Sequence, residues 1–290
     1  MAEAELGQYA LGYFESWNLE SLQAVTDAAE ATRSPVILGF SGLHLPHPAR
    51  IVKEHLNLYA ALGLEACRCL VTPACLIFNE SPHVEWVLEA IALGFSLVMY
   101  SHETLSLEEQ SERVRRIVEK AHQVGVAVEG EVAALPGLGG QLSAIPDDLR
   151  LTDVEAARAF VERTGVDALA VNVGQAHLHG RAPARLNLGR LSELCQAVSV
   201  PLVMHAASSV SRADVAEAIR LGIRKINVGS ALKQVYFQTL QHACAEIGSD
   251  YNPYDVVGSG LAGDVLTAGR IALQKTTADL MRLFGSADRA

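Results

Sequence analysis

Short apolar runs rich in Val, Ile and Leu recur along the chain, separated by longer segments that mix apolar and charged residues. Such runs are typical of strands that are buried on both faces of a parallel sheet. A weaker run near Tyr13 and Phe14 adds to seven clear ones. The seven predicted strands are Pro35–Gly39, Ala74–Phe78, Ser96–Tyr100, Val126–Glu129, Ala168–Val173, Pro201–His205 and Lys225–Val228.

The segments between these runs carry the signals of helix ends. Ser106 and Glu109 form a capping box, which predicts a helix that runs toward Gly125. Two more helices are predicted over Asp153–Thr164 and Ser211–Leu221, because each segment starts with a good capping residue and is followed by Gly.

Eight strand and helix units predict an α/β fold, a (β/α)8 TIM barrel whose parallel sheet closes on itself. Residues 1–290 are predicted to form one such domain, since no break in composition marks a linker. An open doubly wound sheet is the alternative, but no Gly-x-Gly-x-x-Gly turn follows an early strand. The stretch Leu135–Leu149, which contains Gly and Pro, is predicted to be a long loop.

Composition narrows the classes of function. Half of the residues are hydrophobic and 19% are charged, a balance typical of a soluble enzyme. The net charge of −10, with 23 scattered Lys and Arg, argues against a nucleic-acid partner. We expect no membrane span and no export signal, and therefore a cytoplasmic protein. The five cysteines are odd in number and lack metal spacing, which predicts reduced packing residues.

Residues directly after the strands of such a barrel surround its active site. His177 and His205 follow two consecutive strands, and Glu80 follows a third. Two imidazoles and one carboxylate are a common ligand set for a divalent metal. A single histidine there is more readily explained by a hydrogen bond at the rim, but two on neighbouring strands favour metal binding.

Further polar residues follow other strands. Glu129 and Glu131 are two positions apart, so their side chains are expected on the same side of the strand. Two carboxylates at a barrel mouth need a cation or a shared proton, which makes Glu131 a candidate metal ligand. An ion pair with a neighbouring strand is the equal alternative. His102 is a candidate catalytic residue, whereas the following are predicted to be structural or solvated: His44, His47 and His122.

Two serines near the end of the chain indicate a phosphate site. Ser208 and Ser230 each precede a helical segment, and small residues such as Gly229 stand beside them. Small side chains let backbone N–H groups approach a phosphate, as in the late strands of many barrels. A serine at a helix start is more often only a capping residue, so these serines alone are a weak signal.

With these residues in place, the chain resembles the class II, metal-dependent ketose-bisphosphate aldolases, in particular those acting on fructose- and tagatose-bisphosphate. The resemblance extends over nearly the whole chain. It rests on Arg33–Leu38, Val126–Glu131, Thr164–Val171, Gly174–His177, Pro201–Ser208, Lys225–Lys233 and Leu283–Ala287.

The resemblance implies roles for individual residues. His177 and His205 match two of the three zinc-binding histidines of the family. Asn227 matches an asparagine that contacts the dihydroxyacetone-phosphate part of the substrate. Ser208, Gly229 and Ser230 match phosphate-binding positions. A metal at this site would polarise a ketone and stabilise an enediolate.

Several departures fall where the reaction takes place. The family has Asp-His where this chain has Asn79-Glu80, and an amide cannot take the proton that the aspartate handles. Glu80 makes the metal site harder, so manganese, iron and magnesium become alternatives to zinc. Ser101 replaces a carboxylate, and Glu15 replaces an asparagine. The loop that carries a general-base Glu in the family has no acid in this chain, and Ala206 replaces a glycine.

The leading hypothesis is a divergent metal-dependent aldolase, or a related enolate-forming lyase, acting on a phosphorylated ketose or keto compound. Asn79 is then a candidate catalytic position, and Glu80, Glu15 or His102 would supply the missing proton-transfer groups. The alternatives are a sugar-phosphate isomerase or epimerase and a catalytically silent binding subunit. The resemblance further implies a homodimer or homotetramer.

Overall fold

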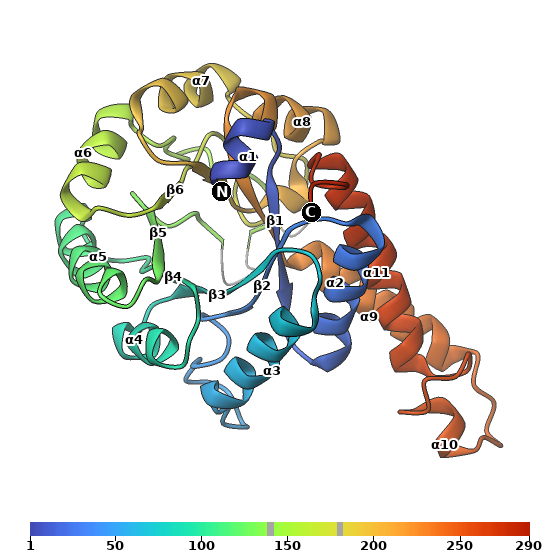
Figure 1. Ribbon diagram of the computed structural model, residues 1–290. Helices are drawn as coiled ribbons and strands as arrows, with labels where there is room; N and C mark the ends of the chain where they lie inside the picture. The colour runs from blue at the N-terminus through green and yellow to red at the C-terminus, as the bar shows by residue number, and fades with distance from the viewer. Residues whose placement is uncertain (138–141, 179–181) are drawn as a thin grey trace.

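The computed structural model describes residues 1–137, 142–178 and 182–290. Its centre is a closed barrel of eight strands in the order β1 to β8. Every neighbouring pair is parallel, including β8 with β1. Helices form a ring around this barrel (Figure 1). The predicted (β/α)8 barrel is confirmed.

Each predicted apolar run forms one strand of the barrel, with boundaries that move by a few residues. The weak run near Tyr13 is the first strand, and it closes the barrel by pairing with the last. The strands are β1 Leu11–Ser16, β2 Val36–Ser41, β3 Ala74–Ser81, β4 Leu97–Tyr100, β5 Ala127–Glu131, β6 Ala168–Ala170, β7 Leu202–Met204 and β8 Ile223–Val228.

The predicted helix starts are also confirmed. The Ser106 hydroxyl accepts the Glu109 N–H, and the Glu109 carboxylate accepts the Ser106 N–H. Asp153 and Ser211 cap two later helices, by accepting backbone N–H groups. The helices are α1 Ala2–Gly7, α2 Leu19–Thr32, α3 Leu56–Cys69, α4 Val84–Ala92, α5 Leu107–His122, α6 Val154–Thr164, α7 Leu188–Ala197, η1 Ala207–Ser209, α8 Arg212–Leu221, α9 Ser230–Ala245, α10 Pro253–Val256 and α11 Val265–Leu283.

Apolar side chains form the core in two places. The larger part lies between the sheet and the helices, where buried residues of both pack together. Inside the barrel, small clusters of buried side chains come from several strands. These are Tyr13, Ile37, Ile77 and Leu97 in one cluster, and Met99, Ala168, Ala170 and Val203 in the other.

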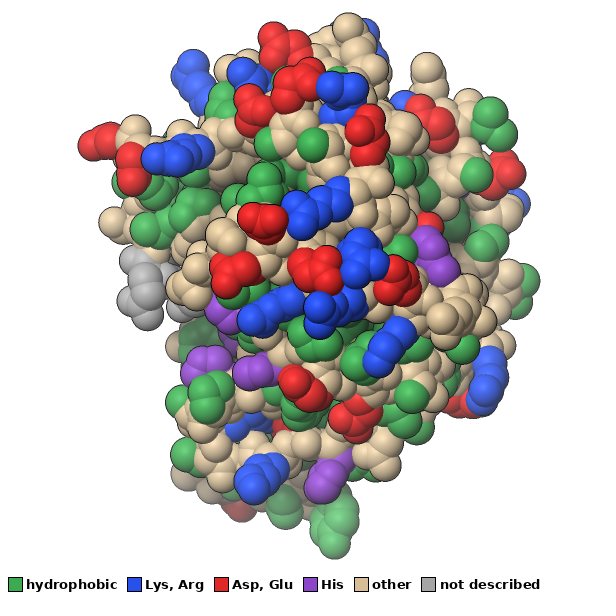
Figure 2. All heavy atoms as spheres, turned by 90° about the vertical axis from the view of Figure 1, so that its left-hand side faces the viewer, with side chains coloured by type: hydrophobic (Ala, Val, Ile, Leu, Met, Phe, Trp, Pro, Cys, Tyr) green, Lys and Arg blue, Asp and Glu red, His purple; other side chains and the backbone are tan. Residues whose placement is uncertain are grey.

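The last part of the chain extends beyond the ring. Helix α11 packs against α2 and α9, and the segment with α10 projects away from the barrel (Figure 1). On the opposite side, α5 and α6 carry interspersed acidic and basic side chains (Figure 2), several of which form ion pairs such as Arg116 with Glu112. Among the described residues, no helix is long and apolar enough to cross a membrane.

The predicted loop and the cysteines can be placed in part. The described parts of the loop, residues 135–137 and 142–149, contain neither helix nor strand, and residues 138–141 lie outside the described residues. This loop connects β5 to α6.

All five cysteines are free thiols, as expected.

Candidate active site

A pocket opens where the strands end, and it gathers most of the residues singled out in the sequence. Nine of the eleven candidate residues line it, whereas Glu131 and His102 are absent from its described lining. The lining residues are Tyr13, Glu15, Ser41, His44, Asn79, Glu80, His177, His205, Ala206, Ser208, Asn227, Val228, Gly229, Ser230 and Lys233.

The end of β3 is bent so that Glu80 enters the pocket. The register between β3 and β4 shifts between Phe78 and Ser81, and Glu80 has a φ of 56°, in the left-handed region. Few residues other than Gly adopt this conformation, and it often marks a functional position. The Asn79 amide donates to Glu80 Oε2 at 2.6 Å, and its carbonyl accepts from the Asn227 amide at 3.3 Å. Asn79 therefore helps to orient the carboxylate.

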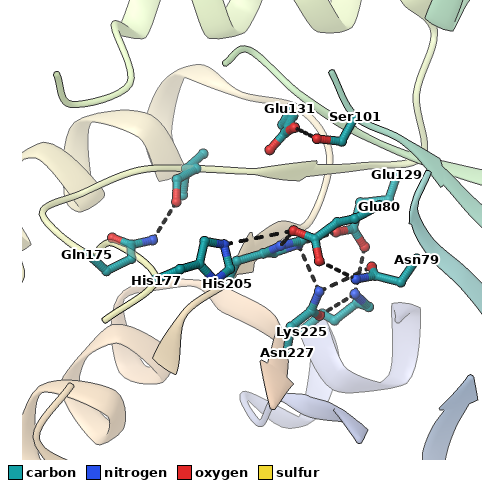
Figure 3. A network of polar contacts seen from close by, with 11 residues as sticks. Asn79, Glu80, Ser101, Glu129, Glu131, Gln175, His177, His205, Lys225 and Asn227 are labelled. Carbon is teal, nitrogen blue, oxygen red and sulfur yellow. Dashed lines mark hydrogen bonds and ion pairs between the residues drawn. The ribbon is translucent and has the colours of Figure 1, made fainter. Parts of the chain in front are cut away.

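His205 lies between two carboxylates. Its Nδ1 is 2.9 Å from Glu80 Oε1, and its Nε2 is 2.7 Å from Glu129 Oε1 (Figure 3). Burial alone would lower the pKa of His205, but Glu80 and Glu129 raise it well above its usual range. Burial would likewise raise the pKa of Glu80, but His205 lowers it. The imidazole is therefore held as a cation by two ionised carboxylates.

A fourth charged group continues this row. Lys225 on β8 is fully buried, and its Nζ lies 2.7 Å from Glu129 Oε2. Burial would raise the pKa of Glu129, but Lys225 and His205 lower it. Glu80, His205, Glu129 and Lys225 thus alternate in charge across the barrel. The sequence left open an ion pair with a neighbouring strand for the β5 glutamates; Glu129 does form ion pairs, but its partners lie on β8 and after β7, whereas β5 pairs with β4 and β6.

His177 approaches the same carboxylate from the segment after β6. Its Nε2 lies 4.0 Å from Glu80 Oε1, and its backbone N–H donates to the Pro136 carbonyl at 3.0 Å. Both predicted metal-binding histidines therefore direct a ring nitrogen at one oxygen of Glu80 (Figure 3).

The donor types at Glu80, His177 and His205 fit a divalent metal. Two imidazole nitrogens and a carboxylate oxygen suit zinc, manganese or iron. Glu129 contacts Nε2 of His205, the ring nitrogen that points away from Glu80. A carboxylate in this position often orients a metal-binding histidine. The spacing is that of an ion pair, however, and no three His, Cys, Asp or Glu side chains of the described ranges are grouped closely enough to form a ready metal site. The donor types fit a metal, but His177 would have to move closer to Glu80 and His205 to join them as a ligand.

Glu131 is placed apart from this row. Its carboxylate accepts the hydroxyl of Ser101, the residue that stands in place of the carboxylate expected there (Figure 3). Burial raises the pKa of Glu131 to about 7, against the lowering effect of Ser101. The structure therefore gives Glu131 a hydroxyl partner, and its role as a metal ligand stays a prediction.

The other side of the pocket holds the predicted phosphate residues. The Ser230 hydroxyl donates to the Ser208 hydroxyl at 3.1 Å, which joins the start of α9 to the segment after β7. Ala206 has a φ of 55°, the left-handed conformation that favours glycine. Glu15 on β1 pairs with Lys233 in the first turn of α9 at 2.5 Å.

His102 and several pocket residues show where sequence reasoning was incomplete. His102 is half-buried, and its ring contacts Thr104 and lies near Tyr100, away from the pocket lining. His44, predicted to be structural or solvated, lines the pocket instead. Tyr13 also lines it, and its buried hydroxyl has no hydrogen-bond partner among the described residues. Tyr13 belongs to β1 and His44 follows β2, and this position at an early strand was the feature of the sequence that could have identified them.

Comparison with known proteins places this chain in a family. The family model "Fructose-bisphosphate aldolase class-II" matches residues 1–289. A fructose-bisphosphate aldolase of Thermus caldophilus is 30% identical, over 100% of this chain and 97% of the relative. A sulfofructosephosphate aldolase of Alkalicoccus urumqiensis is 28% identical, over 97% of this chain and 93% of the relative.

A solved structure agrees with these relatives. The crystal structure of the YdjI aldolase from Escherichia coli K12 matches with a TM-score of 0.80 and 27% identity, over 100% of this chain and 96% of that one. Fold and sequence thus point the same way. The chain belongs to the class II fructose-bisphosphate aldolase family, which confirms the predicted carbon–carbon lyase acting on a phosphorylated sugar.

Proposed function

We propose that this chain cleaves a phosphorylated ketose with the help of a divalent metal held by Glu80, His177 and His205. The observation that supports this most is that both histidines direct a nitrogen at one Glu80 oxygen, 2.9 and 4.0 Å away. A cation in this set would supply Lewis-acid stabilisation of the enediolate that carbon–carbon cleavage requires.

The residues around the donors have separate tasks. Glu129 fixes the orientation and tautomer of His205 through its 2.7 Å contact with Nε2. Ser208, Gly229 and Ser230 bind the substrate phosphate, and Asn227 contacts the part of the substrate next to it. Proton transfer falls to the carboxylates that line the pocket, Glu80 and Glu15, while His102 remains a predicted contributor from outside the lining.

The finer properties follow from the same proposal. Zinc is expected from the family, and the carboxylate of Glu80 makes manganese, iron or magnesium the alternatives. Residues 1–290 act as one barrel domain. A cytoplasmic location and assembly into a homodimer or homotetramer complete the proposal, together with a phosphorylated small molecule as partner and neither nucleic acid nor membrane.

The test is metal-dependent exchange of the α-proton of dihydroxyacetone phosphate with solvent. The purified protein is loaded with each metal in turn, and exchange is followed by NMR in D2O. We expect exchange that is lost with a chelator and in His177→Ala, and retained in the matched control His242→Ala, an exposed histidine on α9. No exchange with any metal would contradict the proposal. With ketose phosphates as substrates, a rearranged sugar without a shorter product would indicate isomerisation instead.

A further inference from the structure

Glu15 occupies an unusual place for an acidic residue in a pocket proposed to bind a phosphate. It belongs to β1 and lines the pocket, and its side chain is only 14% exposed. Oε1 lies 2.5 Å from Lys233 Nζ. On the other side, Oε2 lies against Gly229, where an added Cβ would stand only 2.3 Å from it. One carboxylate therefore touches two residues at the start of α9.

The start of α9 is where an anion would be expected to bind. Gly229 is the N-cap of this helix and has no side chain with which to cap it. The free N–H groups and the dipole of a helix start attract anions. Lys233 sits one turn into the helix, and it is the one Lys or Arg in the described lining of the pocket. The start of α9 and Lys233 together make this end of the pocket positive.

We propose that Glu15 is a specificity-determining residue that holds the place of an anion at this end of the pocket. The proposal rests on the proposed function, because it takes Gly229 and Ser230 as phosphate-binding residues. A substrate phosphate must then compete with the Glu15 carboxylate for Lys233 and for the start of α9. Small anions such as inorganic phosphate have few other contacts and lose this competition, whereas a sugar phosphate is also bound through its carbon chain.

A purely structural ion pair makes a different prediction. Lys233 is 37% exposed, and ion pairs with that much solvent contact contribute little to stability. If Glu15 only anchored Lys233, its removal would leave the lysine less well placed, and phosphate would bind no better. If Glu15 competes with phosphate, its removal strengthens binding.

The experiment measures binding of inorganic phosphate by calorimetry to the wild type and to Glu15→Gln. We expect the Kd for phosphate to fall on the order of tenfold in Glu15→Gln, which corresponds to removing one repulsive charge a few ångströms away. Lys233→Gln is expected to weaken phosphate binding. The matched control is Glu246→Gln, the same loss of charge at an exposed position beyond the far end of α9. Glu15→Asn serves as the second variant should the glutamine not fold.

The outcomes separate the two proposals. Unchanged or weaker phosphate binding in folded Glu15→Gln or Glu15→Asn overturns the role of Glu15, and so does an equal gain in Glu246→Gln. α-Proton exchange is measured on the same samples. Exchange without a gain in phosphate affinity removes this inference alone, whereas a gain in affinity without exchange in any sample supports it and removes the proposed reaction.

Discussion

His205 Nδ1 lies 2.9 Å from Glu80 Oε1, although the two residues are 125 positions apart in the chain. The contact joins β3 to the segment after β7 across the mouth of the barrel. A proton or a metal ion must lie between these two atoms, because a carboxylate and a bare imidazole lone pair would repel each other. The measurable properties of the site therefore depend on which cation occupies this position.

Glu129→Gln is expected to weaken metal binding about 10- to 100-fold, because the partner that orients a metal-binding histidine is lost. The measurement is a metal titration with a competing chromophoric chelator. Glu131→Gln, the same change two residues along β5, distinguishes the roles of the two glutamates. A larger loss in Glu131→Gln than in Glu129→Gln would show that Glu131 is the ligand and that its contact with Ser101 gives way.

Glu80→His is expected to raise the preference for zinc over manganese about tenfold or more, since imidazole is a softer ligand than carboxylate. Elemental analysis after growth with both metals, followed by competition titrations, measures the ratio. Glu80→Ala should reduce total metal content. Metal content unaffected by Glu80→Ala would exclude Glu80 from the ligand set.

Ala206→Gly is expected to stabilise the fold by about 1 kcal/mol or less, because glycine adopts the observed φ of 55° without the clash that an alanine Cβ makes. Thermal unfolding measures this as a rise of a few degrees in Tm. Ala207→Gly is the matched control, in the adjoining 3-10 helix, where glycine only adds flexibility to the unfolded chain. A fall in Tm for both variants would contradict the strain at Ala206.

The stability of the protein is expected to fall with rising pH through Glu131. Burial raises its pKa from 4.5 to about 7 in the folded state, so the folded state keeps a proton that the unfolded chain has released. This stabilising contribution is complete below pH 4.5 and is lost as the pH rises through 7. Its full size is about 3 kcal/mol by linkage.

Urea unfolding at pH 5 and pH 8 in the presence of a chelator measures this effect against Glu131→Gln, which cannot titrate. We expect the wild type to lose more unfolding free energy between the two pH values than the variant does. Exposed Glu162→Gln on α6 is the control and should follow the wild type. Parallel behaviour of wild type and Glu131→Gln would show that the carboxylate is ionised at both pH values.

The barrel could be predicted because each strand is recognisable from its own apolar residues. A run such as Ala74–Phe78 is apolar whatever surrounds it, and Ser106 with Glu109 caps a helix through neighbours three residues apart. The run at Tyr13 is weaker, but an eight-stranded barrel requires a strand there, and this strand does pair with β8.

The site could be predicted only as far as strand ends reveal it. His205 was found because it ends a predicted strand, Glu80 because it comes just after one, and His177 because it lies in the short segment after another. The pairing of Lys225 with Glu129 was missed, because it depends on which side chains meet inside the barrel. Their spacing of two predicts that Glu129 and Glu131 point to the same side of β5. Yet Glu129 contacts His205, which follows β7 across the barrel, and Glu131 contacts Ser101, which follows the neighbouring β4.

The row of alternating charges formed by Glu80, His205, Glu129 and Lys225 is divided unequally between the two halves of the chain. The first four strands contribute Glu80 alone, while the last four contribute His205, Glu129 and Lys225. With His205 protonated, this row would leave one uncompensated negative charge on a fragment with β1 to β4 and one positive charge on the fragment with β5 to β8. The pair of Glu15 with Lys233 divides between the fragments in the same sense. Two half-barrels expressed separately would thus attract each other at the very surface they must join, which makes this chain suited to complementation from fragments.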